Sequence, residues 1–240
     1  MKRIFRIKNE LSLNGSGKSV CTVYTKGSNF KSPFELEALK AFGNAVNTKC
    51  LEADSDELYE YLAHRQKTVD IVAFKGGEPT IHDNIMDVMR HIKGYYGMEI
   101  GLETNGTEPD MLFEIICEGI AEYVTLDILS GRTSYSLASG ISIDDEVWKK
   151  LEESKTMLIE EDEVEREFCT TVVGGFHTDR DFEEIRDFIN GGDTYRLRRF
   201  IGGQASGTFY TPSDEEMQKY AEIVRPAVKN VIVEPCISLF

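Results

Sequence analysis

The feature that most restricts the fold of this chain is a regular alternation of short apolar runs with longer amphipathic stretches. The apolar runs are rich in β-branched and aromatic residues, which predicts strands at 19–25, 69–74, 98–103, 123–128, 168–173, 195–200 and 231–234. The stretches between them predict helices at 34–45, 56–66, 84–95, 110–118, 145–159, 182–189 and 214–228. Strands that alternate with helices predict a parallel sheet with right-handed crossovers.

The number of repeating units narrows this α/β class further. About six strand–helix units are more than a small flavodoxin-like domain needs and fewer than the eight of a closed barrel. We therefore expect a mainly parallel sheet in a partial (β/α)6-type barrel, formed by a single domain over residues 1–240. In such architectures the ligand lies at the carboxyl ends of the strands. Gly191-Gly192 and Gly202-Gly203 are expected to be turns inside the domain.

Charge and hydropathy favour some partners over others. The net charge of −15 argues against nucleic acid, because phosphate binding requires clustered Lys and Arg. No apolar run reaches the roughly 18 residues that a membrane span needs, and the charged N-terminus does not have the apolar region of a secretory signal. We therefore expect a cytoplasmic protein with a small-molecule ligand. Segment 144–167 is strongly acidic, which fits a solvated helix and loop or a surface for a basic partner protein.

The cysteines do not form a recognisable metal or disulfide pattern. They are scattered through the chain without a C-x2-C pair, at Cys21, Cys50, Cys117, Cys169 and Cys236. Such spacing in a cytoplasmic chain predicts free, mostly buried thiols. Gly15-Ser16-Gly17-Lys18-Ser19 is similar to the end of a phosphate-binding loop, but a strand is expected after it where that motif needs a helix.

Polar motifs follow three consecutive predicted strands. Lys75-Gly76-Gly77-Glu78-Pro79 forms a turn in which glycines allow close backbone approach and one acid could meet an ammonium group, although a simple turn explains it equally well. In Leu102–Gly106, the side chains of Glu103 and Asn105 suit ribose hydroxyls or a cation, or they belong to an Asn-Gly turn. Asp127 lies near the end of the next strand and should have a partner.

Taken together, these motifs resemble the radical S-adenosylmethionine (SAM) superfamily. Gly76–Pro79 matches its GGEP motif, and Leu102–Gly106 resembles its L-[DE]-T-N-G motif. Thr25–Phe30 looks like the T-x-G-C-N-F entry to the iron–sulfur loop, and Arg166–Val173 is similar to a later strand of that family. The resemblance covers nearly the whole chain and is strongest to the activating enzymes of glycyl-radical proteins, especially those of the archaeal-type anaerobic ribonucleotide reductase.

The chain departs from the family at the cluster ligands. The resemblance implies a C-x3-C-x2-C motif, but its three positions are Ser28, Ser32 and Glu35. In the family these cysteines hold a four-iron–four-sulfur cluster, and SAM chelates its fourth iron. Thiolate is soft and readily ionised, whereas a serine hydroxyl is hard and stays protonated at neutral pH. We therefore expect neither the standard cluster nor another metal at these positions.

The remaining family positions can be carried over individually. The resemblance implies that Gly76, Gly77, Glu78 and Pro79 hold the SAM ammonium and that Phe34 lies near the adenine. It assigns Glu103 and Asp127, together with Asn105, to ribose or a monovalent cation. The D-x-K motif of the family becomes Asp127-Ile128-Leu129, so the lysine that meets the SAM carboxylate is absent. The adenosine side of the site is thus better preserved than the carboxylate side.

Three functions remain open from the sequence. The first is a cluster-free relative that binds SAM or another adenosine-containing ligand without radical cleavage, as a regulatory pseudoenzyme or for polar SAM chemistry. The second is an active radical SAM enzyme of the activating type, whose non-standard cluster uses Cys21 and Cys169, which lie on predicted strands, or other cysteines. The third is a purely structural or protein-binding descendant.

Overall fold

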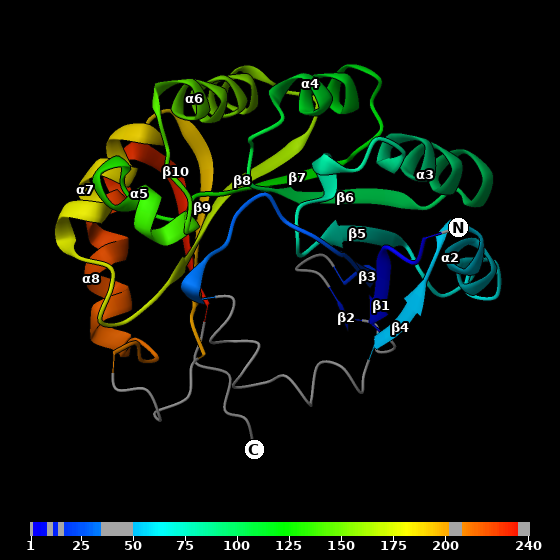
Figure 1. Cartoon of the computed structure of the whole chain (residues 1–240), viewed down its shortest axis with the longest axis horizontal. Coiled ribbons are helices and arrows are strands. Elements are labelled where there is room, and N and C mark those ends of the chain that lie inside the picture. The colour runs from blue at the N-terminus through cyan, green and yellow to red at the C-terminus, as the bar shows by residue number, and fades with distance from the viewer. Residues whose placement is uncertain (1, 9–11, 14–16, 35–49, 202–207, 235–240) are drawn as a thin grey trace. The chain divides into compact units, whose positions relative to one another are not determined.

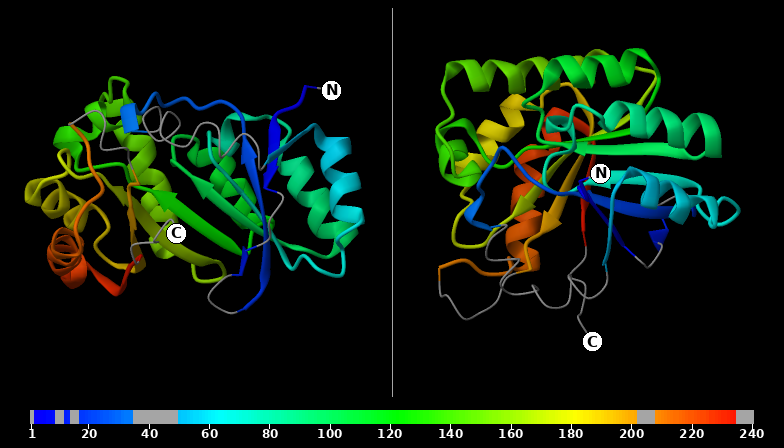
Figure 2. Two further views of the ribbon diagram at one scale, coloured as in Figure 1. Left: turned by 90° about the horizontal axis from the view of Figure 1, so that it is seen from below. Right: turned by 45° about the vertical axis from the view of Figure 1, so that its right-hand side comes forward.

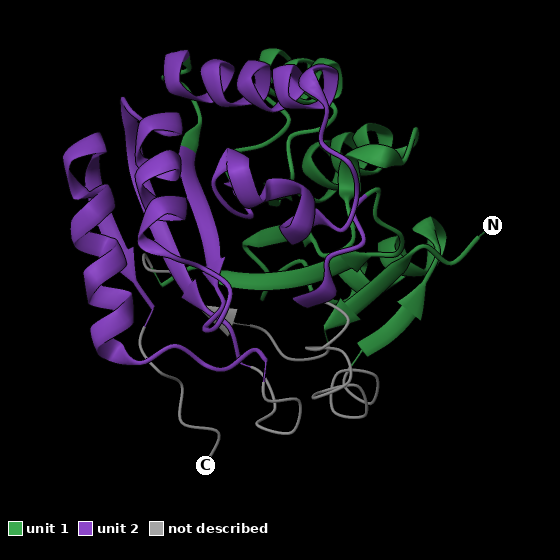
Figure 3. Ribbon diagram, turned by 60° about the vertical axis from the view of Figure 1, so that its left-hand side comes forward, with its two compact units in different colours: residues 1–29, 44–125, 161–165 green, residues 30–43, 126–160, 166–240 purple. Residues whose placement is uncertain are grey.

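The computed structural model describes residues 2–8, 12–13, 17–34, 50–201 and 208–234. The chain divides into two compact units, which Figure 3 shows in different colours. Unit 1 comprises residues 1–29, 44–125 and 161–165, and unit 2 comprises residues 30–43, 126–160 and 166–240. Among the described residues, no helix is long and apolar enough to cross a membrane.

The sheet of unit 1 combines parallel and antiparallel strands. Strands β3 (Ser19–Thr25), β5 (Ile71–Lys75) and β6 (Glu99–Thr104) are parallel neighbours in that order. Strand β1 (Phe5–Lys8) runs antiparallel to β3 and to β4 (Cys50–Ala53), and β2 (Ser12–Leu13) also pairs with β3. Strand β7 (Tyr123–Asp127) begins in unit 1, and its last two residues belong to unit 2.

The described residues of unit 1 also form three α-helices and two shorter helical turns. They are α2 (Ser55–Ala63), η1 (Pro79–Ile81), α3 (Ile85–His91), the π-type turn η2 (Ile92–Tyr96) and α4 (Pro109–Cys117). Helices α2 and α3 lie beside each other in both Figure 1 and Figure 2. The core of the unit contains buried residues of β1, β5, α2 and α3, including Phe5, Phe74, Leu62 and Met89. Each such buried side chain contributes roughly 1.5–3 kcal/mol through removal of apolar surface from water.

Unit 2 is built on three parallel strands. They are β8 (Glu165–Val172), β9 (Gly192–Arg199) and β10 (Val228–Val233), with β9 between the other two. Its helices are α5 (Arg132–Ser139), α6 (Asp145–Glu160), α7 (Asp179–Phe188), α8 (Asp214–Val224) and the turn η3 (Arg225–Ala227). Helices α7 and α8 pack against each other, with Phe182 stacked on Tyr220 at 4.1 Å between ring centroids. Capping boxes begin both helices, with Thr178 and Asp181 at α7 and Ser213 and Glu216 at α8.

The predicted elements are found with shifted ends, and several elements were missed. Strands β1, β2 and β4 and helix α5 were not predicted. Cys50 is the first residue of β4. The predicted helix at 84–95 divides into α3 and the π-type turn, which ends at Gly97 with φ 69°. The predicted helix at 34–45 and the turn at 202–203 lie largely or wholly outside the described residues.

Candidate functional site

The turn after β5 is built by two glycines in a conformation that other residues rarely adopt. Gly76 and Gly77 have φ of 63° and 57°. A Cβ on Gly77 would lie 2.2 Å from the carbonyl oxygen of Gly27, and one on Gly76 would lie 2.4 Å from the ring of Tyr24. The turn is also hydrogen-bonded to the end of β3, because Glu78 N donates to Gly27 O at 2.8 Å. The turn at 76–78, after β5, is therefore hydrogen-bonded to and packed against residues 25–27 at the end of β3.

Glu78 is buried within this turn, with only 1% of its surface exposed. Its Oε1 accepts hydrogen bonds from Thr80 N (3.1 Å), Thr80 Oγ1 (2.7 Å) and Thr104 Oγ1 (2.7 Å). Its Oε2 accepts one from Asn105 N at 2.7 Å. Burial raises the pKa of this carboxyl group, and these hydrogen bonds oppose the rise by stabilising the charged form. Glu78 thus connects β5, η1 and the end of β6; its role toward an ammonium group stays a prediction.

Asn105 fixes the first half of the loop that contains Ser28. Its Nδ2 donates to Asn29 Oδ1 at 2.8 Å, and its Oδ1 accepts from Thr107 N and Thr107 Oγ1 at 3.0 and 2.7 Å. Asn29 Nδ2 donates in turn to Thr107 Oγ1 at 2.6 Å. Asn105 is 8% exposed. These bonds support a positioning role for Asn105, which holds the residue next to Ser28.

The second half of the loop belongs to unit 2 and is attached to the end of α5. Lys31 N donates to Ser139 O at 2.7 Å. A Cβ on Gly140 would lie 2.1 Å from Lys31 O, so the loop passes directly over a glycine. Phe30 packs edge-on against Tyr135 at 6.3 Å between ring centroids. The loop is held on both sides of the junction between Asn29 and Phe30.

Phe34 lies in an apolar cluster of unit 2. Its ring centroid is 4.6 Å from that of Phe176 and 4.9 Å from that of Phe209. Leu129, which stands where the resemblance implies a lysine, packs against the same cluster. Phe34 is only 9% exposed, so its proposed contact with an adenine stays a prediction.

His177 supports this cluster from a fully hydrogen-bonded position. Its Nδ1 accepts from Val173 N at 2.9 Å, and its Nε2 lies 2.9 Å from the carbonyl oxygen of Leu129. The first bond requires an unprotonated Nδ1, which makes the neutral Nε2–H tautomer the one that satisfies both partners. Burial lowers the pKa of this histidine, which favours the neutral ring.

The two remaining predicted acids each have a basic neighbour that the sequence reading missed. Glu103 Oε2 lies 3.9 Å from Lys75 Nζ, and Asp127 Oδ1 lies 3.7 Å from Arg198 Nη1. The expected partner of Asp127 is therefore found. Lys75 lies next to Glu103 because their strands, β5 and β6, are neighbours, whereas Arg198 reaches Asp127 from β9, across the intervening strand β8. The alternation of side chains along a strand predicts that Lys75 and Phe74 point to opposite faces of the sheet. It does not predict that Lys75 lies beside Glu103.

The donor groups of the loop do not fit a four-iron–four-sulfur cluster. Two of the three ligand positions are the hydroxyls of Ser28 and Ser32, and Ser32 is 3% exposed. The third, Glu35, lies outside the described residues. Across residues 2–8, 12–13, 17–34, 50–201 and 208–234, no group of three or more His, Cys, Asp or Glu side chains is arranged to hold a metal ion.

The described cysteines are free thiols in dissimilar surroundings. Cys21 and Cys169 are buried, whereas Cys117 is exposed on α4. Cys21 lies near Tyr61 of α2 and near Arg65, which follows that helix, and burial raises the pKa of its thiol to about 11. It lies on the opposite face of β3 from Tyr24, since side chains alternate along a strand. A protonated thiol on the helix side is a poor iron ligand.

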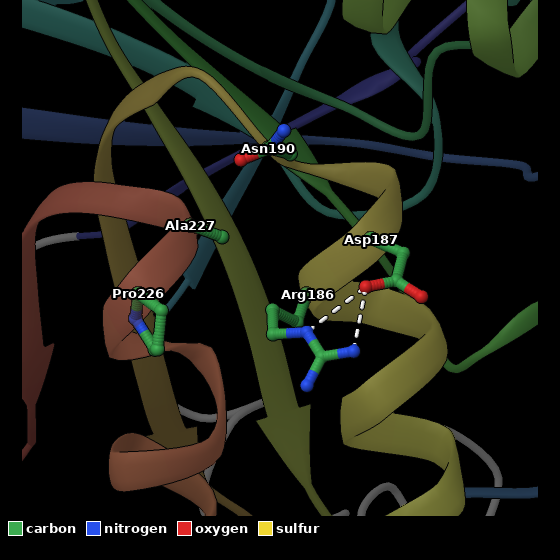
Figure 4. Close-up of a pocket in the computed structure, with 5 residues that line it drawn as sticks. All are labelled: Arg186, Asp187, Asn190, Pro226 and Ala227. Atoms are coloured by element: carbon green, nitrogen blue, oxygen red, sulfur yellow. Dashed lines mark hydrogen bonds and ion pairs between the residues drawn. The ribbon is translucent and has the colours of Figure 1, made fainter.

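A separate hollow of about 370 Å³ lies on unit 2 (Figure 4). Its lining consists of Arg186, Asp187, Asn190, Pro226 and Ala227. Two nitrogens of the Arg186 guanidinium donate to Asp187 Oδ1 at 2.9 and 2.7 Å. The hollow contains none of the site residues predicted from the sequence.

Comparison with known proteins agrees with the motifs and the fold. A protein of Methanocaldococcus jannaschii, whose name assigns it to the glycyl-radical enzyme activating enzymes, is 23% identical over 228 residues, 90% of this chain and 89% of that protein. A radical SAM methyltransferase from Sphaerobacter thermophilus superposes with a TM-score of 0.66 at 14% identity, covering 93% of this chain and 68% of that chain. Streptococcus suis SuiB, solved bound to S-adenosylmethionine, gives a TM-score of 0.54 at 14% identity, covering 78% of this chain and 45% of that chain.

The structural likenesses confirm the predicted α/β fold with mainly parallel strands. The family model of the radical SAM superfamily matches residues 20–189, which is more than half of the sequence. The chain belongs to the radical SAM superfamily.

Proposed function

We propose that this protein is a cluster-free member of its superfamily that binds SAM, or another adenosine-containing ligand, without reductive cleavage. Such binding would serve regulation or polar SAM chemistry. Radical cleavage of SAM requires an electron from an iron–sulfur cluster, whereas transfer of a group from its sulfonium does not. The proposal therefore assigns no step to a cluster.

The observation that carries the proposal is a loop that keeps its supports without its thiolates. Asn29 is bonded to Asn105 and Thr107, and Gly27 accepts from Glu78 N. Lys31 is bonded to the end of α5. The hydrogen bonds of Gly27 and Asn29 and that of Lys31 keep both halves of the loop in a fixed position, as a binding site requires. We infer that the loop still shapes a binding site although its metal ligands are gone.

The proposed ligand contacts follow the strand ends. The backbone of Gly76 and Gly77 and the acid of Glu78, next to Pro79, would receive the ligand's ammonium group. Glu103 and Asp127 would accept hydrogen bonds from ribose hydroxyls, with Asn105 holding the loop. Phe34 would present an aromatic face or edge to the adenine. Glu103 and Asp127 are suited to this because their side chains are 18% and 32% exposed, so they are accessible.

Calorimetric titration with SAM and with adenosine tests the proposal. We expect heat from both ligands, and about tenfold weaker binding of each after Asp127→Asn, which removes one charged acceptor. Asp83→Asn is the matched control, because Asp83 is exposed and outside the proposed site. Absence of binding by either ligand at millimolar concentration would overturn the proposal.

The alternative function is that of an active radical enzyme with a non-standard cluster. It is favoured by the relative from Methanocaldococcus jannaschii, which aligns over most of both chains and is named for activation of glycyl-radical enzymes. Anaerobic reconstitution with iron and sulfide distinguishes the two functions. We expect a colourless protein without bound iron; near-stoichiometric iron and sulfide with a reducible spectroscopic signal would establish the alternative instead.

A further inference from the structure

Three neighbouring strands of unit 1 place an aromatic ring, an ammonium and a carboxylate in one row. The parallel pairing of β3 with β5 sets Tyr24 beside Lys75. The pairing of β5 with β6 sets Phe74 beside Leu102, so the next residues, Lys75 and Glu103, are also neighbours. The row lies at the carboxyl ends of these strands, directly before the Gly76-Gly77 turn, where parallel sheets place their ligands.

The row occupies the face of the sheet opposite the core. Val72 and Phe74 are fully buried, with 0% of their surface exposed. Side chains alternate along a strand, so Lys75 points to the other face. There the side chain of Lys75 is 32% exposed and that of Glu103 is 18% exposed. These groups are sheltered, yet they remain accessible to a ligand.

The Lys75 ammonium is only loosely engaged by the described part of the chain. Its Nζ lies 3.9 Å from Glu103 Oε2 and 6.0 Å from the ring centroid of Tyr24, and no described residue hydrogen-bonds to it. Lys18 is a useful contrast, since its Nζ lies 2.6 and 2.7 Å from the two carboxylate oxygens of Glu99 and 3.1 Å from Tyr123 Oη. A half-buried ammonium with three donors and no close acceptor is suited to an incoming anion.

We propose that Lys75 recognises the carboxylate of the amino-acid part of the bound adenosine ligand. This inference rests on the proposed function and names the group that replaces the missing lysine. Leu129, which stands at that lysine's position, is packed in the Phe34 cluster and cannot serve. In an amino acid the carboxylate and the ammonium are attached to the same carbon. A lysine next to the turn that receives the ammonium is therefore in the right place for the carboxylate.

Comparison of two ligands isolates the carboxylate. SAM and decarboxylated SAM share the adenosine, sulfonium and ammonium groups and differ only in that group. We expect the unaltered protein to prefer SAM by about tenfold, which corresponds to one partly buried ion pair. In Lys75→Met the ratio of the affinities for SAM and decarboxylated SAM should fall to about one, while the affinity for decarboxylated SAM stays within about twofold of the unaltered protein. Lys75→Arg should keep most of the preference for SAM.

Lys67→Met is the matched control, because Lys67 is an exposed lysine of the same unit outside the row. It should leave the preference unchanged. The inference is overturned if Lys75→Met retains the full preference for SAM, and the proposed function then still stands. If the unaltered protein binds neither ligand, the proposed function itself fails, and the role of Lys75 fails with it.

Discussion

The two halves of the loop at residues 25–34 are stabilised by different forces. Hydrogen bonds fix the half that ends at Asn29, through the turn at Gly76–Glu78 and the side chain of Asn105. In the other half, packing predominates, with Phe34 in contact with Phe176 and Phe209. The first set of contacts is directional and the second is not.

This difference accounts for two features of the chain, the retained GGEP turn and the leucine at the position of the family's lysine. The buried hydrogen-bonded turn matches the GGEP motif throughout, because a buried polar group that loses its partner costs about 1–3 kcal/mol. The apolar cluster accepts Leu129 in place of a lysine, since an apolar side chain of suitable size needs no specific partner. The comparison predicts that small changes damage the first half and are tolerated in the second.

The largest effect is expected at the glycine turn. Gly77→Ala would place a Cβ 2.2 Å from Gly27 O at a φ of 57°. We expect the free energy of unfolding to fall by about 3–4 kcal/mol, from the left-handed backbone and the displaced strand end together. Urea unfolding followed by circular dichroism measures this change.

Gly97→Ala is the control for the backbone conformation alone. Gly97 has a φ of 69°, but no atom lies within 4 Å of its added Cβ. This variant should lose only about 1–2 kcal/mol. Equal losses in the two variants would show that the close approach of Gly77 to β3 contributes nothing.

The next effect concerns the apolar half. Phe34→Ala should lower the free energy of unfolding by about 3 kcal/mol, because it leaves a cavity between Phe176 and Phe209. Phe34→Leu keeps most of the apolar volume and should cost less than about 1.5 kcal/mol. Phe113→Ala is the control, as Phe113 is 54% exposed and should change stability by less than about 0.5 kcal/mol. A large loss in Phe34→Leu would mean that this half depends on specific geometry as well.

The sequence predicted the regular part of the fold and the motifs, but not the contacts between strands. Long amphipathic segments such as α6 and α8 bury a repeating face, and their periodicity is visible in the residues. Strand β4 was missed because only Ala53 of its four residues is buried, which leaves no alternation to detect. Helix α5 buries mainly small or polar-ended residues, Tyr135, Ala138 and Ser139, so its apolar face is weak.

The sequence indicated where the candidate residues lie along the strands, but not which groups they bond to. Glu78 and Asn105 follow strand ends and Glu103 is the next-to-last residue of β6, and that much can be deduced from the order of the motifs. The neighbours of Glu103 depend on strand order and register, which bring together residues far apart in sequence. Similarly, the hydrogen bond from Thr104 Oγ1 to Glu78 depends on the packing of β6 beside β5, which the sequence alone does not show.

A smaller loss is expected when the charge of Glu78 is removed without a change in shape. Glu78→Gln puts an amide NH2 against backbone or hydroxyl donors, so at least one hydrogen bond is lost and the others weaken. We expect the free energy of unfolding to fall by about 2 kcal/mol. Glu118→Gln, at an exposed ion pair with Arg90, should produce no measurable change. If Glu78→Gln is as stable as the unaltered protein, the directional half of the comparison is wrong.

The smallest effect is a pH dependence that originates at His177. Its pKa is lowered in the folded protein by burial, so below the ordinary histidine pKa of about 6.5 the unfolded chain binds the extra proton more readily. Stability therefore rises with pH in this range and is lost as the pH falls below about 6.5, by at most about 1.4 kcal/mol per pH unit for one proton.

Denaturant unfolding at pH 7.5 and 5.5 should show a larger decrease in the free energy of unfolding for the unaltered protein than for His177→Gln. His64→Gln, at an exposed histidine, should keep the full decrease. The expected decrease concerns the apolar half of the loop. Protonation of His177 Nδ1 removes the hydrogen-bond acceptor of Val173 N and so loosens the backbone beside the apolar cluster. An unchanged pH dependence in His177→Gln would show that protonation of His177 is not its source.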